Sequence, residues 1–209
     1  MSERDFLSPA AREAARRAVV EAEAETSAEI VVSVRRLSGR YREADYLFGF
    51  AVSLLALLAL LFLPQEFPLW VFAPDVALGF AAGAFACSRL PPLRRLLTSP
   101  RVREANVRQA SRAAFLDGGL SRLPRRNAVL VYVGLFERRV DVVADVGIDT
   151  GPPDAHWSEA LDGLAGALRP RPDYERFLAA LRGMGRALGR VHPRSEDDVN
   201  ELPDEVLAE

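Results

Sequence analysis

The stretch NAVLVYVGLFERRVDVVAD, residues 127–145, determines the fold class of this chain. It contains two runs rich in β-branched residues, Asn127–Leu135 and Arg138–Asp145, separated only by Phe136 and Glu137. Such runs are typical of strands, and so short a connection predicts an antiparallel hairpin. The first run is apolar on both faces, as expected of a strand that is covered on both sides.

A third strand is predicted far upstream, at Ala28–Arg36. Its residues alternate between two faces, with Ile30, Val32 and Val34 on one and Val31, Ser33 and Arg35 on the other. A single strand is not stable by itself. We therefore expect this strand to pair with the two later ones in one sheet.

Helices are predicted on both sides of these strands. Ser8-Pro9 and Ser99-Pro100 each provide an N-cap followed by proline at the first helical position, and the second of these helices ends before Asp117-Gly118-Gly119. Asp154 caps a further helix, and the last helix carries one apolar stripe made of Phe177, Leu181, Met184, Leu188 and Val191. The elements together predict an α/β layer domain, with helices packed against a small mixed sheet.

Two long apolar runs separate the first strand from the rest of the domain. Tyr46–Leu63 contains no charged residue, and the run that follows contains only Asp75. About eighteen helical residues extend for about 27 Å, which is close to the hydrocarbon thickness of a bilayer. A core helix of a soluble protein, the alternative, normally shows a polar stripe. The sequence therefore predicts a two-helix transmembrane hairpin inserted after the first strand.

This insertion predicts the domain organisation. Residues 1–45 and 91–209 form one split domain, 46–63 the first transmembrane helix, 64–75 a short external connection and 76–90 the second transmembrane helix, which can also begin near 68. Arginines flank the hairpin, and the connection has none. The positive-inside rule therefore places both termini in the cytoplasm and the protein in the cytoplasmic (inner) membrane.

The arginines beside the hairpin also predict contact with lipid. Arg89, Arg94 and Arg95 lie next to the second apolar run, where attraction to anionic headgroups is worth about 1 kcal/mol per charge. A topology signal is the alternative role, and the two are compatible. The 27 basic residues are outnumbered by 29 acidic ones, so the chain lacks the basic surplus of a nucleic-acid-binding protein.

Candidate metal ligands lie on one loop that contains glycine. Asp145 and Asp149 flank Gly147, and carboxylate oxygens are ligands that Ca²⁺ prefers. The spacing fits no EF-hand, and ordinary loop acids are the alternative. His156 and His192 have no serine or cysteine partner in a recognised motif. The sequence thus predicts no catalytic residue, and Ca²⁺ at this loop as the one candidate cofactor.

The chain resembles the TPM domain family. EAEAETSAEIVVSV, residues 21–34, resembles the opening motif of that family, in which a Glu-Thr pair leads into a strand. Residues 127–148 resemble the hairpin that follows in the family, with an arginine-rich turn and an Asp-x-Gly-Ile ending. Residues 200–204 are similar to the endings of membrane-anchored bacterial members.

The resemblance implies a three-layer α/β/α sandwich, but it does not decide the function. Family members have been linked to photosystem repair, receptor modulation, calcium binding and acid phosphatase activity. Arg126-Asn127-Ala128 stands where many members have Asp-Asn-Gly, and Ala144-Asp145-Val146-Gly147 where many have Thr-Gly-x-Gly. We therefore expect a non-enzymatic, membrane-anchored TPM-domain protein that acts through membrane or cytoplasmic protein partners, in assembly or maintenance at the cytoplasmic face. A metal-dependent phosphatase-type hydrolase is the alternative.

Overall fold

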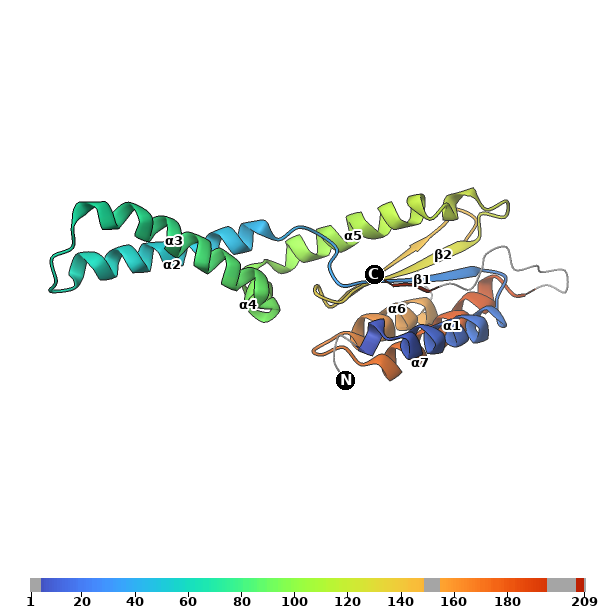
Figure 1. Ribbon diagram of the computed structural model, residues 1–209. Helices are drawn as coiled ribbons and strands as arrows, with labels where there is room; N and C mark the ends of the chain where they lie inside the picture. The colour runs from blue at the N-terminus through green and yellow to red at the C-terminus, as the bar shows by residue number, and fades with distance from the viewer. Residues whose placement is uncertain (1–4, 149–154, 195–205, 209) are drawn as a thin grey trace. The chain divides into compact units, whose positions relative to one another are not determined.

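The computed structural model describes residues 5–148, 155–194 and 206–208, which form a mixed α/β structure (Figure 1). The chain divides into two compact units. Unit 1 combines Met1–Ser38 with Glu104–Glu209, and unit 2 is Gly39–Arg103. Unit 2 extends beyond the predicted boundaries at residues 45 and 91, and it includes the contacts of Arg94 with Tyr41 and Asp45.

Unit 1 is built on a sheet with the strand order β3-β2-β1-β4. Strand β1 (Glu29–Arg35) pairs in parallel with β2 (Ala128–Gly134), and β2 pairs antiparallel with β3 (Arg139–Ala144). The predicted hairpin and its pairing with the upstream strand are therefore confirmed. Strand β4 (Val206–Ala208) adds in parallel to the other side of β1 and was not predicted, because three residues are too few to show a strand period.

Helices lie on both faces of this sheet (Figure 1). Helices α1 (Pro9–Glu23), α6 (Ala155–Ala167) and α7 (Tyr174–Val191) pack on one face. Helix α5 (Pro100–Asp117) and the short η2 (Leu120–Arg122) pack on the other. Ser8 is the N-cap of α1, as predicted, and its Oγ accepts a hydrogen bond from the N–H of Ala11 at 3.1 Å. A further short helix, η1 (Asp5–Leu7), precedes α1.

The predicted alternation of β1 divides its side chains between two apolar cores. Ile30, Val32 and Val34 join the core beneath α1, α6 and α7, whereas Val31 joins the core beneath α5. The apolar stripe of α7 belongs to the first core, as predicted, except that Val191 is 46% exposed at the end of the helix.

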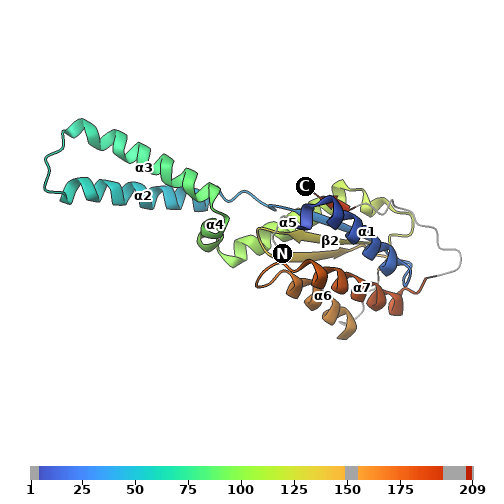
Figure 2. The same cartoon turned by 60° about the horizontal axis from the view of Figure 1, so that its bottom comes forward.

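Unit 2 contains α2 (Arg42–Phe62), α3 (Leu69–Arg89) and the short α4 (Pro91–Leu97). Helices α2 and α3 lie side by side (Figure 2), and both are long and apolar enough to span a membrane. Only 17% and 6% of their apolar windows are buried, unlike the core helix of a soluble protein. These features indicate an association with a membrane. Helix α3 begins near the earlier of its two predicted starts, so Pro74 and Asp75 lie inside it.

Candidate binding groove

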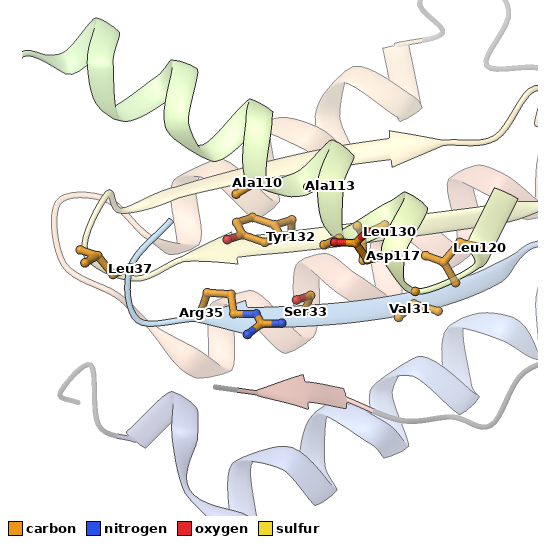
Figure 3. A pocket seen from close by; sticks show the side chains of 12 residues that line it. Val31, Ser33, Arg35, Leu37, Ala110, Ala113, Asp117, Leu120, Leu130 and Tyr132 are labelled. Atoms are coloured by element: carbon orange, nitrogen blue, oxygen red, sulfur yellow. The ribbon is translucent and has the colours of Figure 1, made fainter. Parts of the chain in front are cut away.

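A groove of about 490 Å³ lies in unit 1 on the face of the sheet that carries α5 (Figure 3). Val107 and Phe115 of α5 pack in the core above β2, and Ser111 donates a 2.5 Å hydrogen bond from its Oγ to Asp141 Oδ2 of β3. These contacts fix α5 above β2 and β3. The groove is the space that remains between α5 and β1.

The walls of this groove are mainly apolar. Its floor and ends are formed by strand, loop and η2 residues, namely Val31, Ser33, Arg35, Leu37, Leu120, Leu130 and Tyr132. Its side wall is formed by α5 and the residue after it, namely Ala110, Ala113, Ala114, Asp117 and Gly118. The helical members recur at steps of three and four residues and therefore share one face of α5. Because their side chains are small, the groove stays open.

Ser33 is the most unusual polar residue in the groove. It is 1% exposed, and its Oγ has no hydrogen-bond partner among the described residues. A buried hydroxyl left without a partner costs about 1–3 kcal/mol. A position that retains such a group is therefore a candidate for contact with a ligand.

Arg35 and Tyr132 lie next to Ser33. Arg35 is two residues further along β1 and so lies on the same face, and Figure 3 shows its guanidinium extending back toward Ser33. Tyr132 is the residue of β2 that is directly opposite Ser33 in the parallel register. The three side chains therefore form one polar cluster on an otherwise apolar floor.

The pKa of Tyr132 is raised, mainly because its phenol is buried. The Ser38 hydroxyl lowers this pKa in part, the nearby Glu137 carboxylate raises it, and Arg35 lowers it least. Glu137 is itself 2% exposed, and its two carboxylate oxygens accept hydrogen bonds from the N–H and Oγ of Ser38 at 2.8 and 3.0 Å. Glu137 thus anchors the chain where it leaves β1.

A concave, mostly apolar surface with a few convergent polar groups is the usual form of a small-ligand site. The groove offers hydroxyl donors, one guanidinium and one carboxylate, from Asp117. Its lining contains no histidine or cysteine, and Asp117 is its only carboxylate. These groups can bind a ligand that has both an apolar and a polar part.

The predicted metal ligands are only partly described by the structure. Asp145 is 5% exposed, and its Oδ1 accepts hydrogen bonds from Arg126 Nη2 at 2.9 Å and from the N–H of Val146 at 2.8 Å. Its Oδ2 is buried and has no partner among the described residues. Asp149 and Asp154 lie outside the described residues. No group of three possible metal ligands occurs in the part of the chain that the structure describes.

The three arginines that were predicted to face lipid have different surroundings. Arg94 donates a 2.7 Å hydrogen bond to Asp45 Oδ2, and both side chains are largely buried, at 16% and 10% exposure. Its guanidinium also lies 5.9 Å from the centre of the Tyr41 ring. Arg94 is therefore a structural residue of unit 2. Arg89 is exposed, with its guanidinium 4.6 Å from the centre of the Phe85 ring, and Arg95 lies in the last turn of α4.

The groove is not apparent from the sequence, although part of the signal for it is present there. The alternation of β1 already placed Ser33 and Arg35 on the same face as Val31, so two polar residues shared a face expected to be buried. The position of α5 over β2 and β3 was not predictable, because it depends on contacts such as that between Ser111 and Asp141, thirty residues apart.

Comparisons with known proteins concern the fold. No protein-family model matches this chain, and no curated protein matches it. Among solved structures, the chain is similar to the NMR structure of the BA42 protein from the psychrophilic bacterium Bizionia argentinensis sp. nov.. The two are 16% identical, the match covers 98% of this chain and 96% of that one, and the TM-score is 0.58. At this identity the likeness supports a shared α/β fold and carries no information about activity.

Proposed function

We propose that this protein is a membrane-anchored member of the TPM domain family that binds protein partners at the cytoplasmic face of the inner membrane and supports their assembly or maintenance. The observation that carries the proposal is the position of the hairpin in the chain. Two exposed helices of membrane length lie between β1 and β2, which pair along seven residues of one sheet. A hairpin returns the chain to the membrane face that it left, so one folded unit is held at one face.

The proposal includes a three-layer α/β/α arrangement for unit 1. Two observations support it: α1, α6 and α7 pack on one face of the sheet and α5 on the other, and residues 21–34 and 127–148 resemble the motifs of the family. Within unit 2, Arg89 and Arg95 are the residues proposed to contact anionic headgroups. Arg94 is left out because Asp45 already binds it.

The proposed topology is tested by fractionation and by reporters. We expect the full chain to stay in the membrane pellet after alkaline carbonate extraction, because α2 and α3 expose apolar side chains along their length. Reporters that are active only in the cytoplasm should be active at both termini, because the arginines flank the hairpin on the termini side. Activity only of reporters that require export would contradict this orientation.

The proposed partner binding is tested by affinity capture from detergent-solubilised membranes. The bait is the full chain, and the control bait is the hairpin alone, residues 39–103, which keeps the membrane element and lacks unit 1. We expect a partner that is retained by the full chain and absent from the control. Identical captures with both baits would contradict a role for unit 1.

A metal-dependent phosphatase is the second candidate, favoured by the buried Oδ2 of Asp145, which has no hydrogen-bond partner among the described residues. A metal bound to the native state stabilises it by about 2.7 kcal/mol at a hundredfold excess over Kd. We expect no such gain in millimolar Ca²⁺ or Mg²⁺, and no turnover of p-nitrophenyl phosphate, because Arg126 already supplies a positive charge beside this carboxylate.

The matched variant for that experiment is Asp145→Asn. It lowers the melting temperature with and without metal, because it weakens the ion pair with Arg126. The quantity to compare is therefore the change in melting temperature that the metal causes in each protein. A calcium-dependent rise in the wild-type melting temperature that Asp145→Asn abolishes, together with metal-dependent turnover, would favour the hydrolase instead.

A further inference from the structure

We propose that the groove between α5 and β1 binds a small monoanionic amphiphile, namely a carboxylate with a short unbranched apolar body. This inference goes beyond the proposed partner binding and does not depend on it. It rests on two residues of the polar cluster, Ser33 and Arg35, and on the alanine side chains of α5 that line the groove. It also rests on the negative charge of Asp117 at the C-terminal end of α5.

Ser33 and Arg35 would bind the carboxylate head. Ser33 lines the groove and is 1% exposed, and its buried Oγ lacks a hydrogen-bond partner among the described residues, so a ligand oxygen would supply the missing hydrogen bond. Arg35 lies on the same face of β1, and the planar fork of N–H donors in a guanidinium matches the geometry of a carboxylate. Figure 3 shows the guanidinium extending along β1 toward Ser33, and both residues line the groove.

The alanine wall of α5 would bind the apolar body. Ala110, Ala113 and Ala114 line the groove together with Val31 and Leu130 of the sheet, so a hydrocarbon chain in it would contact apolar atoms of both the helix and the sheet. The helical segment from Ala110 to Asp117 is about 10 Å long at 1.5 Å per residue. A chain of six carbons fits this length.

The distribution of charge explains why one anionic group is expected rather than two. Asp117 lines the groove at the C-terminal end of α5, where the helix dipole is also negative. A second carboxylate at that end would be repelled. At the other end the Glu137 carboxylate accepts two hydrogen bonds from Ser38, and Arg35 provides the positive charge. The head is therefore expected at the Arg35 end.

The test uses the full chain in phosphatidylcholine nanodiscs, with ¹³C-labelled alanine methyl groups, titrated with hexanoate at pH 7. We expect saturable chemical-shift changes at the methyl groups of Ala110, Ala113 and Ala114. Hexylammonium and hexan-1-ol have the same apolar body without the anionic head, and we expect no saturable change with either. Partition of the probes into the lipid would not saturate at these three methyl groups.

Variants locate the binding. Arg35→Gln should weaken hexanoate binding by at least about tenfold, the usual effect of losing a charge-assisted hydrogen bond. Ala113→Leu should abolish it by filling the groove while keeping a good helix former. Ser33→Ala should weaken it by several-fold and yet raise the melting temperature of the unliganded chain, because it removes a buried hydroxyl that has no hydrogen-bond partner in the described part of the chain. The matched control is Arg112→Gln, which removes the same charge from an exposed position of α5 that does not line the groove.

Three results would overturn the proposal. The first is the absence of a saturable shift with hexanoate in the folded wild-type chain, as expected if the groove holds only a segment of a partner protein. The second is saturable binding of hexylammonium or hexan-1-ol as tight as that of hexanoate. The third is an equal loss of affinity in Arg112→Gln and Arg35→Gln. If Arg35→Gln does not fold, the comparison of Ser33→Ala and Ala113→Leu with Arg112→Gln decides the outcome.

Discussion

At the scale of the residue, Tyr174 is a polar side chain inside the first apolar core. Its hydroxyl donates a hydrogen bond to the carbonyl of Ala11, and its ring packs edge-on against Phe6 with 4.9 Å between ring centres. Burial raises the pKa of Tyr174 to about 12. Because an unfolded tyrosine ionises near pH 10, the unfolded chain loses this proton first as the pH rises. The stabilising contribution of the neutral phenol is thus complete below about pH 10 and is lost as the pH approaches about 12.

We therefore expect the free energy of unfolding to fall between pH 9 and pH 11, and to fall less in Tyr174→Phe. The variant keeps the ring but has no proton to lose, and a pKa difference of one unit corresponds to about 1.4 kcal/mol. Denaturant unfolding of both chains at pH 7, 9, 10 and 11 measures the difference. Tyr132, whose pKa is also raised by burial, accounts for part of the remaining slope. Equal slopes in wild type and Tyr174→Phe would contradict the assignment.

The sequence predicted which face of β1 each side chain occupies, because alternation is a property of the strand itself. It did not predict which polar groups would be satisfied. Ser33 and Asp145 each retain a buried oxygen without a partner in the described structure, whereas Glu137, an unremarkable turn residue in the sequence, is buried and bound by Ser38. Whether a buried polar group has a hydrogen-bond partner depends on residues far away in the chain, and the local sequence pattern contains no information about them.

At the scale of the element, the hairpin shows how close two helices can lie when glycines face each other. A Cβ atom added at Gly83 would lie 2.9 Å from the Cα of Gly49 and 2.9 Å from the Cβ of Val52. Gly79 and Gly83 form a G-x-x-x-G motif on α3, the spacing that brings transmembrane helices close together. The composition of the sequence predicted the two apolar helices. The glycines of this motif in addition allow α2 and α3 to lie in close contact.

We expect Gly83→Val to destabilise the hairpin by about 1–3 kcal/mol, the usual cost of overpacking, because the added atoms would force α2 and α3 apart. The measurement is SDS-induced unfolding in detergent micelles, followed by tryptophan fluorescence. A Trp157→Phe background leaves Trp70 of α3 as the reporter, since the chain has 2 tryptophans. The control is Ala82→Val, an exposed neighbour on the same helix. Similar midpoints for the two variants would show that the contact at Gly83 does not hold the hairpin together.

At the scale of the whole molecule, the order of the strands in the sheet, β3-β2-β1-β4, differs from their order in the chain. The sequence could predict only part of this arrangement. An isolated strand is not stable, so β1 was predicted to pair with strands that follow the two apolar runs in the chain. The structure shows this pairing, between β1 and β2. The addition of β4 to the other side of β1 and the placement of α5 over only part of the sheet were not predictable. Both depend on which non-local contacts bury the most surface, and periodicity does not report this.

The interior position of β1 leads to a prediction about fragments. A fragment of residues 104–209 lacks β1 and α1, so all seven residues of β2, which are buried in the folded unit, would border an open sheet edge. We expect this fragment to aggregate or to bind the dye ANS without a cooperative thermal transition. The matched control joins residues 1–38 to 104–209 through a flexible glycine–serine linker, which restores unit 1 without the hairpin and should unfold cooperatively. A soluble 104–209 fragment that unfolds cooperatively by itself would mean that β1 is dispensable. The unit would then not depend on the segment that precedes its membrane hairpin.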